Sequence, residues 1–297
     1  MKRTRESLRV LSVLSQWYPD VPALFCGDLF HKAESVDTDL LREWTTFNDV
    51  NYNWRMYYIN GNHELNHKND PHNYQLGIPD MLCKSWMRSL NFGWTFLKPN
   101  IIVHGIPYID NNTGVDAYLK SLIEKEKIGS DNTKHILMLH TTYPGARDTD
   151  GREIESPNSI NPNLLNKFDL VLCGHIHKPQ QLSKKVYMIG APIQQRRTDK
   201  DAEMGFWKLY DDLSMKFIPL DGWPKFIDVE TEEEVKDDGN YYTVLGKKSS
   251  EIINPNHKIT KQLSPKSLAR KYMRAKGVKN PGIRNKLTQV LNQSQND

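Results

Sequence analysis

Short apolar runs, each followed closely by a polar residue, recur along the first two thirds of the chain. They are ALFC (23–26), MYYI (56–59), ILML (136–139) and DLVLC (169–173). Apolar runs of this length, bounded by turn residues, are typical of buried β-strands. Three later runs predict further strands: VYMIG (186–190), GFWKLY (205–210) and MKFIPL (215–220).

Segments with helical spacing lie between these strands. Leu8, Leu11 and Leu14 recur at near-helical spacing and predict an amphipathic helix over residues 4–16. Further helical segments are expected at 37–48, 79–90, 115–127 and 161–167. Strands that alternate with helices predict an α/β layered core, and in such sheets ligands collect beyond the carboxyl ends of the strands.

The charge of the chain changes sign in its last quarter. Residues 228–238 carry seven acidic side chains and one lysine, whereas residues 258–297 carry ten basic side chains and one aspartate. This break predicts a main domain over 1–222, an acidic linker or small accessory segment over 223–256, and a basic helical tail over 257–297. The candidate helices of the tail are 265–275 and 281–291.

Cysteine content and hydropathy limit the class of protein. The three cysteines, Cys26, Cys83 and Cys173, cannot all pair, and we interpret them as reduced thiols of a cytoplasmic protein. No run of about eighteen apolar residues is present, so the sequence predicts no membrane span. The formal net charge of +4 is too small over 297 residues to indicate a nucleic-acid partner by itself.

Residues that can bind metal stand at the predicted strand ends. They are Asp28, Asn62, His140, His175 and His177. Carboxylate, amide and imidazole ligands together suit divalent manganese, iron or zinc. Two such ions about 4 Å apart can generate a hydroxide and bind the oxygens of a phosphoryl displacement, so the sequence predicts phosphoester hydrolysis.

His63, next to Asn62, is the candidate general acid, because a histidine can donate a proton near neutral pH. Glu64 has two interpretations. It either holds the ring of His63 in place or is a solvated surface glutamate.

Four ordered motifs resemble the calcineurin-like metallophosphoesterase superfamily over roughly residues 5–220: GDLFH (27–31), GNHE (61–64), LMLHTT (137–142) and GHIH (174–177). Four segments look like its SbcD branch of DNA double-strand-break repair exonucleases: GDLFH (27–31), VHGIPY (103–108), GHIHKPQ (174–180) and GAPIQ (190–194). The resemblance implies a four-layer αββα sandwich with a C-terminal helical extension and two divalent ions, commonly Mn²⁺. It implies that Asp28 bridges the ions, that Asn62, His140 and His175 complete one site, and that His177 serves the other. The general acid would be His63.

The family pattern opens with Asp-x-His on the first strand, and this chain has no such motif. Residues 1–22 contain no histidine, so the resemblance leaves the second metal site with only Asp28 and His177. Three explanations are open: a strand encoded upstream of Met1, a strand contributed by another chain, or a one-metal or inactive relative. We favour the first, because the retained first site and His63 would serve no purpose in a scaffold.

We therefore expect a metal-dependent DNA nuclease subunit, an exonuclease or endonuclease that hydrolyses phosphodiester bonds in recombination or repair. By resemblance, its partners are DNA and an SbcC-type ABC ATPase, onto which helices of the tail dock; packing of those helices on the chain's own core is the alternative. A homodimer in the cytoplasm of a bacterium or of a phage-infected host cell is a further expectation. The alternative functions are another metallophosphoesterase, such as a protein phosphatase or small-molecule phosphodiesterase, and a noncatalytic scaffold with a degenerate metal site.

Several loop residues that follow the motif strands are candidate contacts for DNA phosphates. They are Tyr143, Arg147, Arg152, Arg196 and Arg197. The alternative for each arginine is a solvated surface position.

Overall fold

The computed structural model describes residues 2–30, 38–51, 53–65, 76–109, 112–130, 132–154, 160–245, 252–254 and 257–258. The chain divides into two compact units, Met1–Lys225 and Phe226–Asp297. The first unit contains every candidate site residue, and the second contains a small sheet. The finer division expected at residues 222 and 256 stays a prediction.

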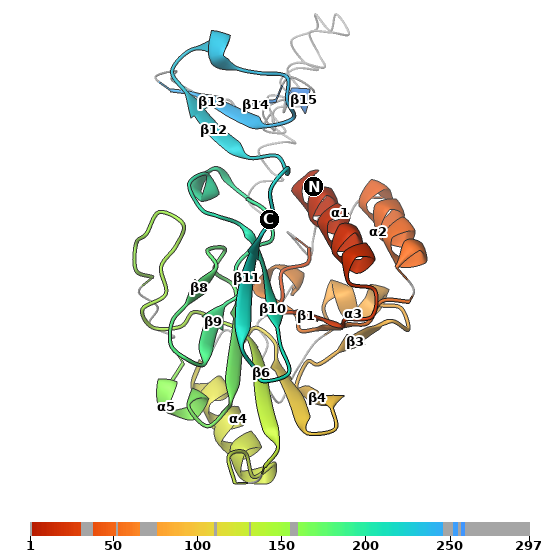
Figure 1. The fold of residues 1–297 in the computed structure, drawn as a ribbon, viewed down its shortest axis with the longest axis vertical. Helices are drawn as coiled ribbons and strands as arrows, with labels where there is room; N and C mark the ends of the chain where they lie inside the picture. The colour runs from red at the N-terminus through yellow and green to blue at the C-terminus, as the bar shows by residue number, and fades with distance from the viewer. Residues whose placement is uncertain are drawn as a thin grey trace, which may run out of the picture. The chain divides into compact units, whose positions relative to one another are not determined.

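Two helices and a three-stranded parallel sheet form one half of the first unit. The elements, in chain order, are α1 (Lys2–Trp17), β1 (Ala23–Phe25), α2 (Thr38–Val50), β2 (Met56–Tyr58) and β3 (Met87–Ser89). In Figure 1 the two helices stand side by side, and both contribute buried side chains to one apolar core with alternate residues of the strands. Leu8, Leu11 and Leu14 lie in that core, which confirms the amphipathic helix expected over residues 4–16.

A six-stranded mixed sheet forms the other half. Its strands, in spatial order, are β4 (Gly93–Lys98), β5 (Ile101–Ile106), β6 (Lys134–His140), β7 (Leu170–Gly174), β9 (Val186–Met188) and β8 (Gln180–Gln181). The central strands pair in parallel, and the edge strands β4 and β8 pair antiparallel. Helices α4 (Asn112–Lys125) and α5 (Pro162–Leu165) pack on its outer face. Because both faces are covered, β6 and β7 have nearly continuous apolar sequences.

The side chains of β6 show how the layers are ordered. Leu137 and Leu139 lie in the core shared with α4 and α5, whereas Ile136 and Met138 lie in another core. Leu24 of β1 packs against this other core, which therefore lies between the two sheets. The resulting order of helix, sheet, sheet and helix confirms the predicted αββα sandwich.

A separate hairpin completes the first unit. Its strands are β10 (Gly205–Leu209) and β11 (Met215–Pro219). Trp207 of β10 and Leu24 of β1 both pack against the core between the sheets. Within the described residues β1 pairs with β2 alone and β10 with β11 alone. The backbone groups of Ala23 and Phe25 form hydrogen bonds on the side of β1 that faces β2. Successive residues of a strand point their backbone N–H and C=O groups to opposite edges, so those of Leu24 point to the edge of β1 away from β2.

One predicted helix is wrong. The segment 79–90 does not form a single helix, because α3 (Ile78–Leu82) is five residues long and β3 follows it. Met87 of β3 is buried and pairs with Met56 of β2, so strand pairing outweighs the local helical spacing. The other expected helices are present as α1, α2, α4 and α5, and β4 and β5 form a hairpin that was not expected.

The second unit is a small mixed sheet. Its strands are β12 (Phe226–Val229), β13 (Tyr241–Val244), β14 (Ile252–Asn254) and β15 (His257–Lys258). The acidic stretch contributes the turn η4 (Glu232–Glu234), and Val229, Tyr242 and Val244 form a core. Beyond β15 the predicted helical tail lies outside the described residues. Among the helices that the structure describes, none has the length and apolarity that crossing a membrane requires.

Candidate metal centre

Four of the predicted ligands lie at the carboxyl ends of parallel strands, two from each sheet. Asp28 follows β1, and Asn62 begins the turn η2 (Asn62–Glu64) after β2. His140 is the last residue of β6, and His175 follows β7. The sandwich thereby brings together side chains that are far apart in the sequence.

The ligand atoms of these four residues converge. His140 Nε2 lies 3.3 Å from Asp28 Oδ2 and 3.1 Å from Asn62 Oδ1. His175 Nδ1 lies 3.1 Å from Asn62 Oδ1 and 3.3 Å from His140 Nε2. Asp28, His140 and His175 each offer one ligand atom, and these three atoms lie within 4.8 Å of one another. The geometry is that of a site for one small cation.

The charges at the centre follow from burial and from the pairing of Asp28 with His140. Burial alone would lower the pKa of His140, but the charge and hydrogen bond of Asp28 outweigh it, and the pKa lies above its usual value. Burial would raise the pKa of Asp28, whereas His140 and then His63 lower it. Burial, and secondly the charge of His140, lower the pKa of His175 to about 4, so His175 is neutral at pH 7.

The residues present fit a divalent cation. Nδ1 of His140 donates to the carbonyl oxygen of Cys26 at 2.7 Å, so the ring faces the centre with Nε2. Three acceptor atoms, from Asp28, Asn62 and His175, surround that nitrogen, and a single N–H can satisfy only one of them well. A divalent ion in place of this proton would bind all four atoms, because carboxylate, amide and imidazole are suitable ligands.

Metal binding at this centre is expected to release a proton. Asp28 favours the protonated form of His140, which must lose its Nε2 proton before that nitrogen can bind metal. Because the pKa of His140 is raised above its usual 6.5, the affinity for Mn²⁺ should increase as the pH rises above that value. Calorimetric titration in buffers of different ionisation enthalpy measures the released proton. An affinity that stays constant between about pH 6 and pH 9 would contradict this expectation.

Glycines before the ligands allow the loops to pack this closely. Gly27 has a φ of +95°, and a Cβ atom there would overlap Nδ1 of His140. A Cβ atom on Gly174 would overlap the carbonyl oxygen of Cys26. Asp28 and His175, which follow these glycines, have φ values of 61° and 86°. This conformation costs about 1–3 kcal/mol per residue and is concentrated at functional sites.

Glu64 connects the two ligand loops of the three-stranded sheet. Its carboxylate accepts hydrogen bonds from the backbone N–H groups of Asp28 at 2.9 Å, Phe30 at 2.9 Å and Gly61 at 2.6 Å. The residue is 1% exposed, so the interpretation as a solvated surface glutamate is wrong. Burial and the charge of Asp28 raise the pKa of Glu64 to about 7, although the amide donors oppose this. Fixing the backbone of two loops is a role that the sequence did not predict.

His63 is half-buried beside the centre. Its backbone N–H donates to Asp28 Oδ1 at 3.1 Å. Its charge influences the pKa values of both Asp28 and His175, so its side chain lies near the ligands. This place is compatible with a general acid, and that role stays a prediction.

His177 is not one of the converging ligands. Its Nδ1 lies 3.0 Å from Oδ2 of Asp199, the last residue of the turn η3 (Arg197–Asp199). Burial would raise the pKa of Asp199, but the hydrogen bond and charge of His177 lower it, so the carboxylate is ionised. Sequence reasoning missed Asp199, because it follows no apolar run and its partner is 22 residues away.

A second residue that was missed is Tyr108, within the quoted segment VHGIPY (103–108). Its ring stacks on that of His175 with centroids 6.1 Å apart, and it meets the ring of His140 edge-on at 6.2 Å. Tyr108 thus covers two of the ligands. The signal that could have found it was its place as the last residue of that segment, two residues after the end of β5.

The candidate phosphate contacts lie in different surroundings. They are Tyr143, Arg147, Arg152, Arg196 and Arg197. Tyr143 packs against the core shared with α4 and α5. The exposed Arg147 lies 3.5 Å from Glu153, and Arg152 is exposed. Arg197 is half-buried, and the exposed Arg196 has its Nε 3.5 Å from Oδ1 of Asp199. Arg196 is therefore linked to the surroundings of His177.

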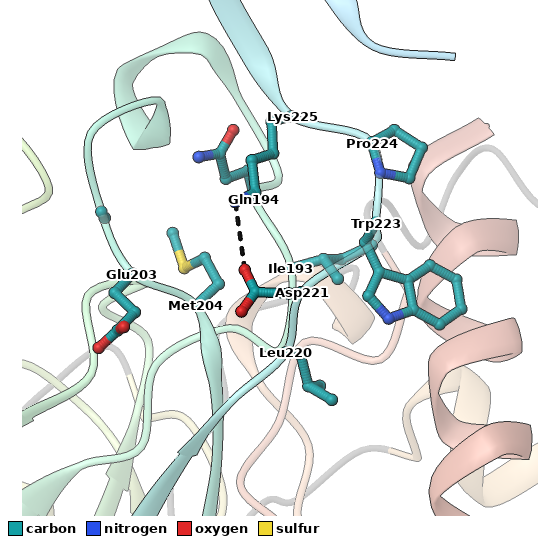
Figure 2. A pocket seen from close by; sticks show the side chains of 10 residues that line it. Ile193, Gln194, Glu203, Met204, Leu220, Asp221, Trp223, Pro224 and Lys225 are labelled. Carbon is teal, nitrogen blue, oxygen red and sulfur yellow. Dashed lines mark hydrogen bonds and ion pairs between the residues drawn. The ribbon is translucent and has the colours of Figure 1, made fainter. Parts of the chain in front are cut away.

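A pocket lies elsewhere in the first unit, and Figure 2 shows the side chains that line it. Its lining residues are Ile193, Gln194, Ala202, Glu203, Met204, Leu220, Asp221, Trp223, Pro224 and Lys225. Lys225 Nζ and Asp221 Oδ1 form an ion pair of 3.3 Å across part of it. None of the four converging ligands lines this pocket, so it is not part of the candidate metal centre.

The match to a protein-family model agrees with this chemistry. A family model described as calcineurin-like phosphoesterase matches residues 7–179, which include all five predicted metal ligands. The chain is similar to the SbcD subunit of the nuclease SbcCD of Staphylococcus saprophyticus, with 20% identity over 278 residues that cover 84% of this chain and 73% of the relative. It is also similar to the crystal structure of TT1561 of Thermus thermophilus, with 15% identity, a TM-score of 0.45, and coverage of 72% of this chain and 92% of that chain.

Proposed function

Because this chain belongs to the calcineurin-like phosphoesterase family, we propose that it is a metal-dependent nuclease that hydrolyses phosphodiester bonds of DNA. The observation that carries the proposal is the convergence of four ligand atoms from Asp28, Asn62, His140 and His175, with His63 beside them. Similarity to a subunit of the SbcCD nuclease supports a nucleic acid as the substrate, and the resemblance of the motifs to the SbcD branch implies DNA.

The residues of the centre would divide the work of hydrolysis. A divalent ion held by the four ligands would supply positive charge to a phosphoryl oxygen and lower the pKa of a bound water. His63 would donate a proton to the leaving oxygen of the ester. Asp28 is the one anionic side chain among the four ligands and would offset the charge of the ion. Glu64 would keep the backbone of the two ligand loops in place.

We propose Mn²⁺ as the ion, and a second ion held by Asp28 and His177, as the resemblance to the family implies. Asp28 can contribute to two ions because a carboxylate has two oxygens. The other ligands of the second ion would be water or a segment beyond the described residues. We also propose that the protein works on DNA with an SbcC-type ATPase. Support comes from the relative, which is one component of the SbcCD nuclease, and co-purification of the two chains tests it. The cytoplasmic location and the homodimer stay predictions.

Replacing His63 with alanine is expected to slow Mn²⁺-dependent cleavage of linear duplex DNA by about 10²- to 10⁴-fold, the usual contribution of a general acid. Mn²⁺ binding should be unchanged, because His63 is not one of the converging ligands. The control is His257→Ala in the second unit, which should cleave at the wild-type rate. A His63→Ala variant as active as the wild type would remove the general-acid role.

The same assay distinguishes the proposed nuclease from its alternatives. Single-stranded DNA, a phosphoprotein and a nucleotide phosphodiester are tested beside duplex DNA. Hydrolysis of the phosphoprotein or the nucleotide phosphodiester, without hydrolysis of either DNA, would indicate another phosphoesterase instead of a nuclease. Bound Mn²⁺ without hydrolysis of any substrate would indicate a noncatalytic scaffold.

A further inference from the structure

A buried carboxylate beside His177 has no part in the hydrolysis described above. Asp199 is 0% exposed, and its Oδ2 lies 3.0 Å from His177 Nδ1. Burying an ionised carboxylate is costly unless the charge is paired and hydrogen-bonded. The contact with His177 is therefore a specific feature of this loop rather than a chance approach of two surface groups.

Groups other than His177 hold this carboxylate in place. Oδ2 also accepts hydrogen bonds from the backbone N–H groups of Gln195 at 2.9 Å and Arg196 at 3.1 Å. Oδ1 accepts one from the hydroxyl of Thr149 at 3.1 Å and lies 3.5 Å from Arg196 Nε. Two of these donors belong to the backbone, so Asp199 is fixed independently of the imidazole. The carboxylate therefore determines where the ring lies.

The contact also determines which nitrogen of His177 carries the hydrogen. Oδ2 of Asp199 already accepts hydrogen bonds from two backbone N–H groups, so it is an acceptor toward His177 as well, and Nδ1 of His177 is the donor. In a neutral imidazole the other nitrogen, Nε2, then has the lone pair. Metal-binding histidines commonly donate their second nitrogen to a carboxylate, which fixes both the tautomer and the orientation of the ring.

We propose that Asp199 is a positioning residue that holds His177 in the Nδ1–H tautomer and leaves Nε2 available to a divalent ion. The inference rests on the proposed function, in which His177 serves a second ion. It extends that function to Asp199, to which neither the resemblance nor the motifs assign a role. The candidate phosphate contact Arg196 lies 3.5 Å from the same carboxylate and therefore beside His177.

The tautomer of His177 can be measured without metal and without DNA. Long-range proton–nitrogen correlation spectra of ¹⁵N-labelled protein at about pH 8, above the usual titration range of imidazole, distinguish Nδ1–H from Nε2–H. We expect Nδ1–H in the wild type and a mixture in Asp199→Ala. Asp199→Asn keeps the size of the side chain and is used if the alanine variant fails to fold; its neutral amide should reduce the Nδ1–H fraction. A wild type in the Nε2–H form would overturn the inference.

Mn²⁺ affinity gives the second readout. Asp199→Ala is expected to weaken the binding of the ion served by His177 by about 10- to 100-fold, the usual effect of losing such a carboxylate. In the background of His177→Ala the same substitution should cause no further loss, because Asp199 acts through that ring. The matched control is Asp201→Ala, whose side chain is 82% exposed and which should bind Mn²⁺ like the wild type.

Two results of the titration would overturn the inference: an affinity of Asp199→Ala within about twofold of the wild type, or an equal loss in the His177→Ala background. The readouts also separate this inference from the proposed function. An inactive wild type with the Nδ1–H tautomer and the expected change in Asp199→Ala would defeat the nuclease proposal and leave the positioning role intact. An active wild type with the Nε2–H tautomer would do the reverse.

Discussion

Replacing Asp28 with asparagine is expected to abolish Mn²⁺ binding and to slow DNA cleavage at least about a thousandfold. Asp28 is the one anionic side chain among the four converging ligands, and its Oδ2 lies 3.3 Å from His140 Nε2. A metal ion supplies several kcal/mol of transition-state stabilisation, and about 1.4 kcal/mol corresponds to a tenfold change in rate. Losing the ion therefore removes most of the rate enhancement.

The measurements are metal content of the purified variant and its cleavage rate on duplex DNA. Asparagine has nearly the size of aspartate and keeps an oxygen for the backbone N–H of His63, so the fold should persist. The matched control is Asp20→Asn, an exposed residue in the turn before β1, which should behave like the wild type. Cleavage within about tenfold of the wild-type rate would show that hydrolysis does not use this centre.

Replacing Glu64 with alanine should lower the free energy of unfolding by about 3 kcal/mol or more. Three backbone N–H groups, those of Asp28, Phe30 and Gly61, lose their acceptor at once. Each buried donor left without a partner costs about 1–3 kcal/mol. Denaturation in urea, measured without added metal, gives the change.

Two further variants support the interpretation of that experiment. Glu203→Ala removes an exposed glutamate and should change the free energy of unfolding by less than about 0.5 kcal/mol. Glu64→Gln keeps one carbonyl oxygen but turns an amide N–H toward a backbone donor, so its loss should be intermediate. A loss below about 1 kcal/mol in Glu64→Ala would mean that water replaces the carboxylate and that the loops keep their shape without it.

The sequence predicted the converging ligands because position along a strand carries the information. His140 ends the buried strand β6, where ligands collect in layered α/β proteins. His104 and His135 are the same residue type, but they lie within the sheet, buried, with ring nitrogens 3.0 Å apart. Burial lowers the pKa of His104 to about 4, as expected of a neutral core residue. Residue type alone would not have separated these histidines from the candidate ligand His140.

Contacts between loops could not be predicted in the same way. Glu64 was placed beside His63 by sequence, yet its hydrogen bonds include Phe30, 34 residues away. Asp199 reaches His177 across a turn with no periodic pattern to indicate the approach. The three-residue strand β3 forms because it pairs in parallel with β2. That pairing cannot be seen in the local sequence, whose apolar spacing predicted a helix. In each case the determining interaction comes from another part of the fold.

The candidate metal ligands come in pairs from the two sheets, so the geometry of the centre depends on how the two sheets are aligned. Asp28 and Asn62 move with the three-stranded sheet, whereas His140 and His175 move with the six-stranded sheet. An ion bound by both pairs would link the two sheets and resist the sliding of one sheet over the other. A substitution in the core between the sheets, at Met138 for example, would thus weaken metal binding even where the protein stays folded. The core between the sheets would therefore influence the candidate metal centre, although none of the predicted ligands belongs to it.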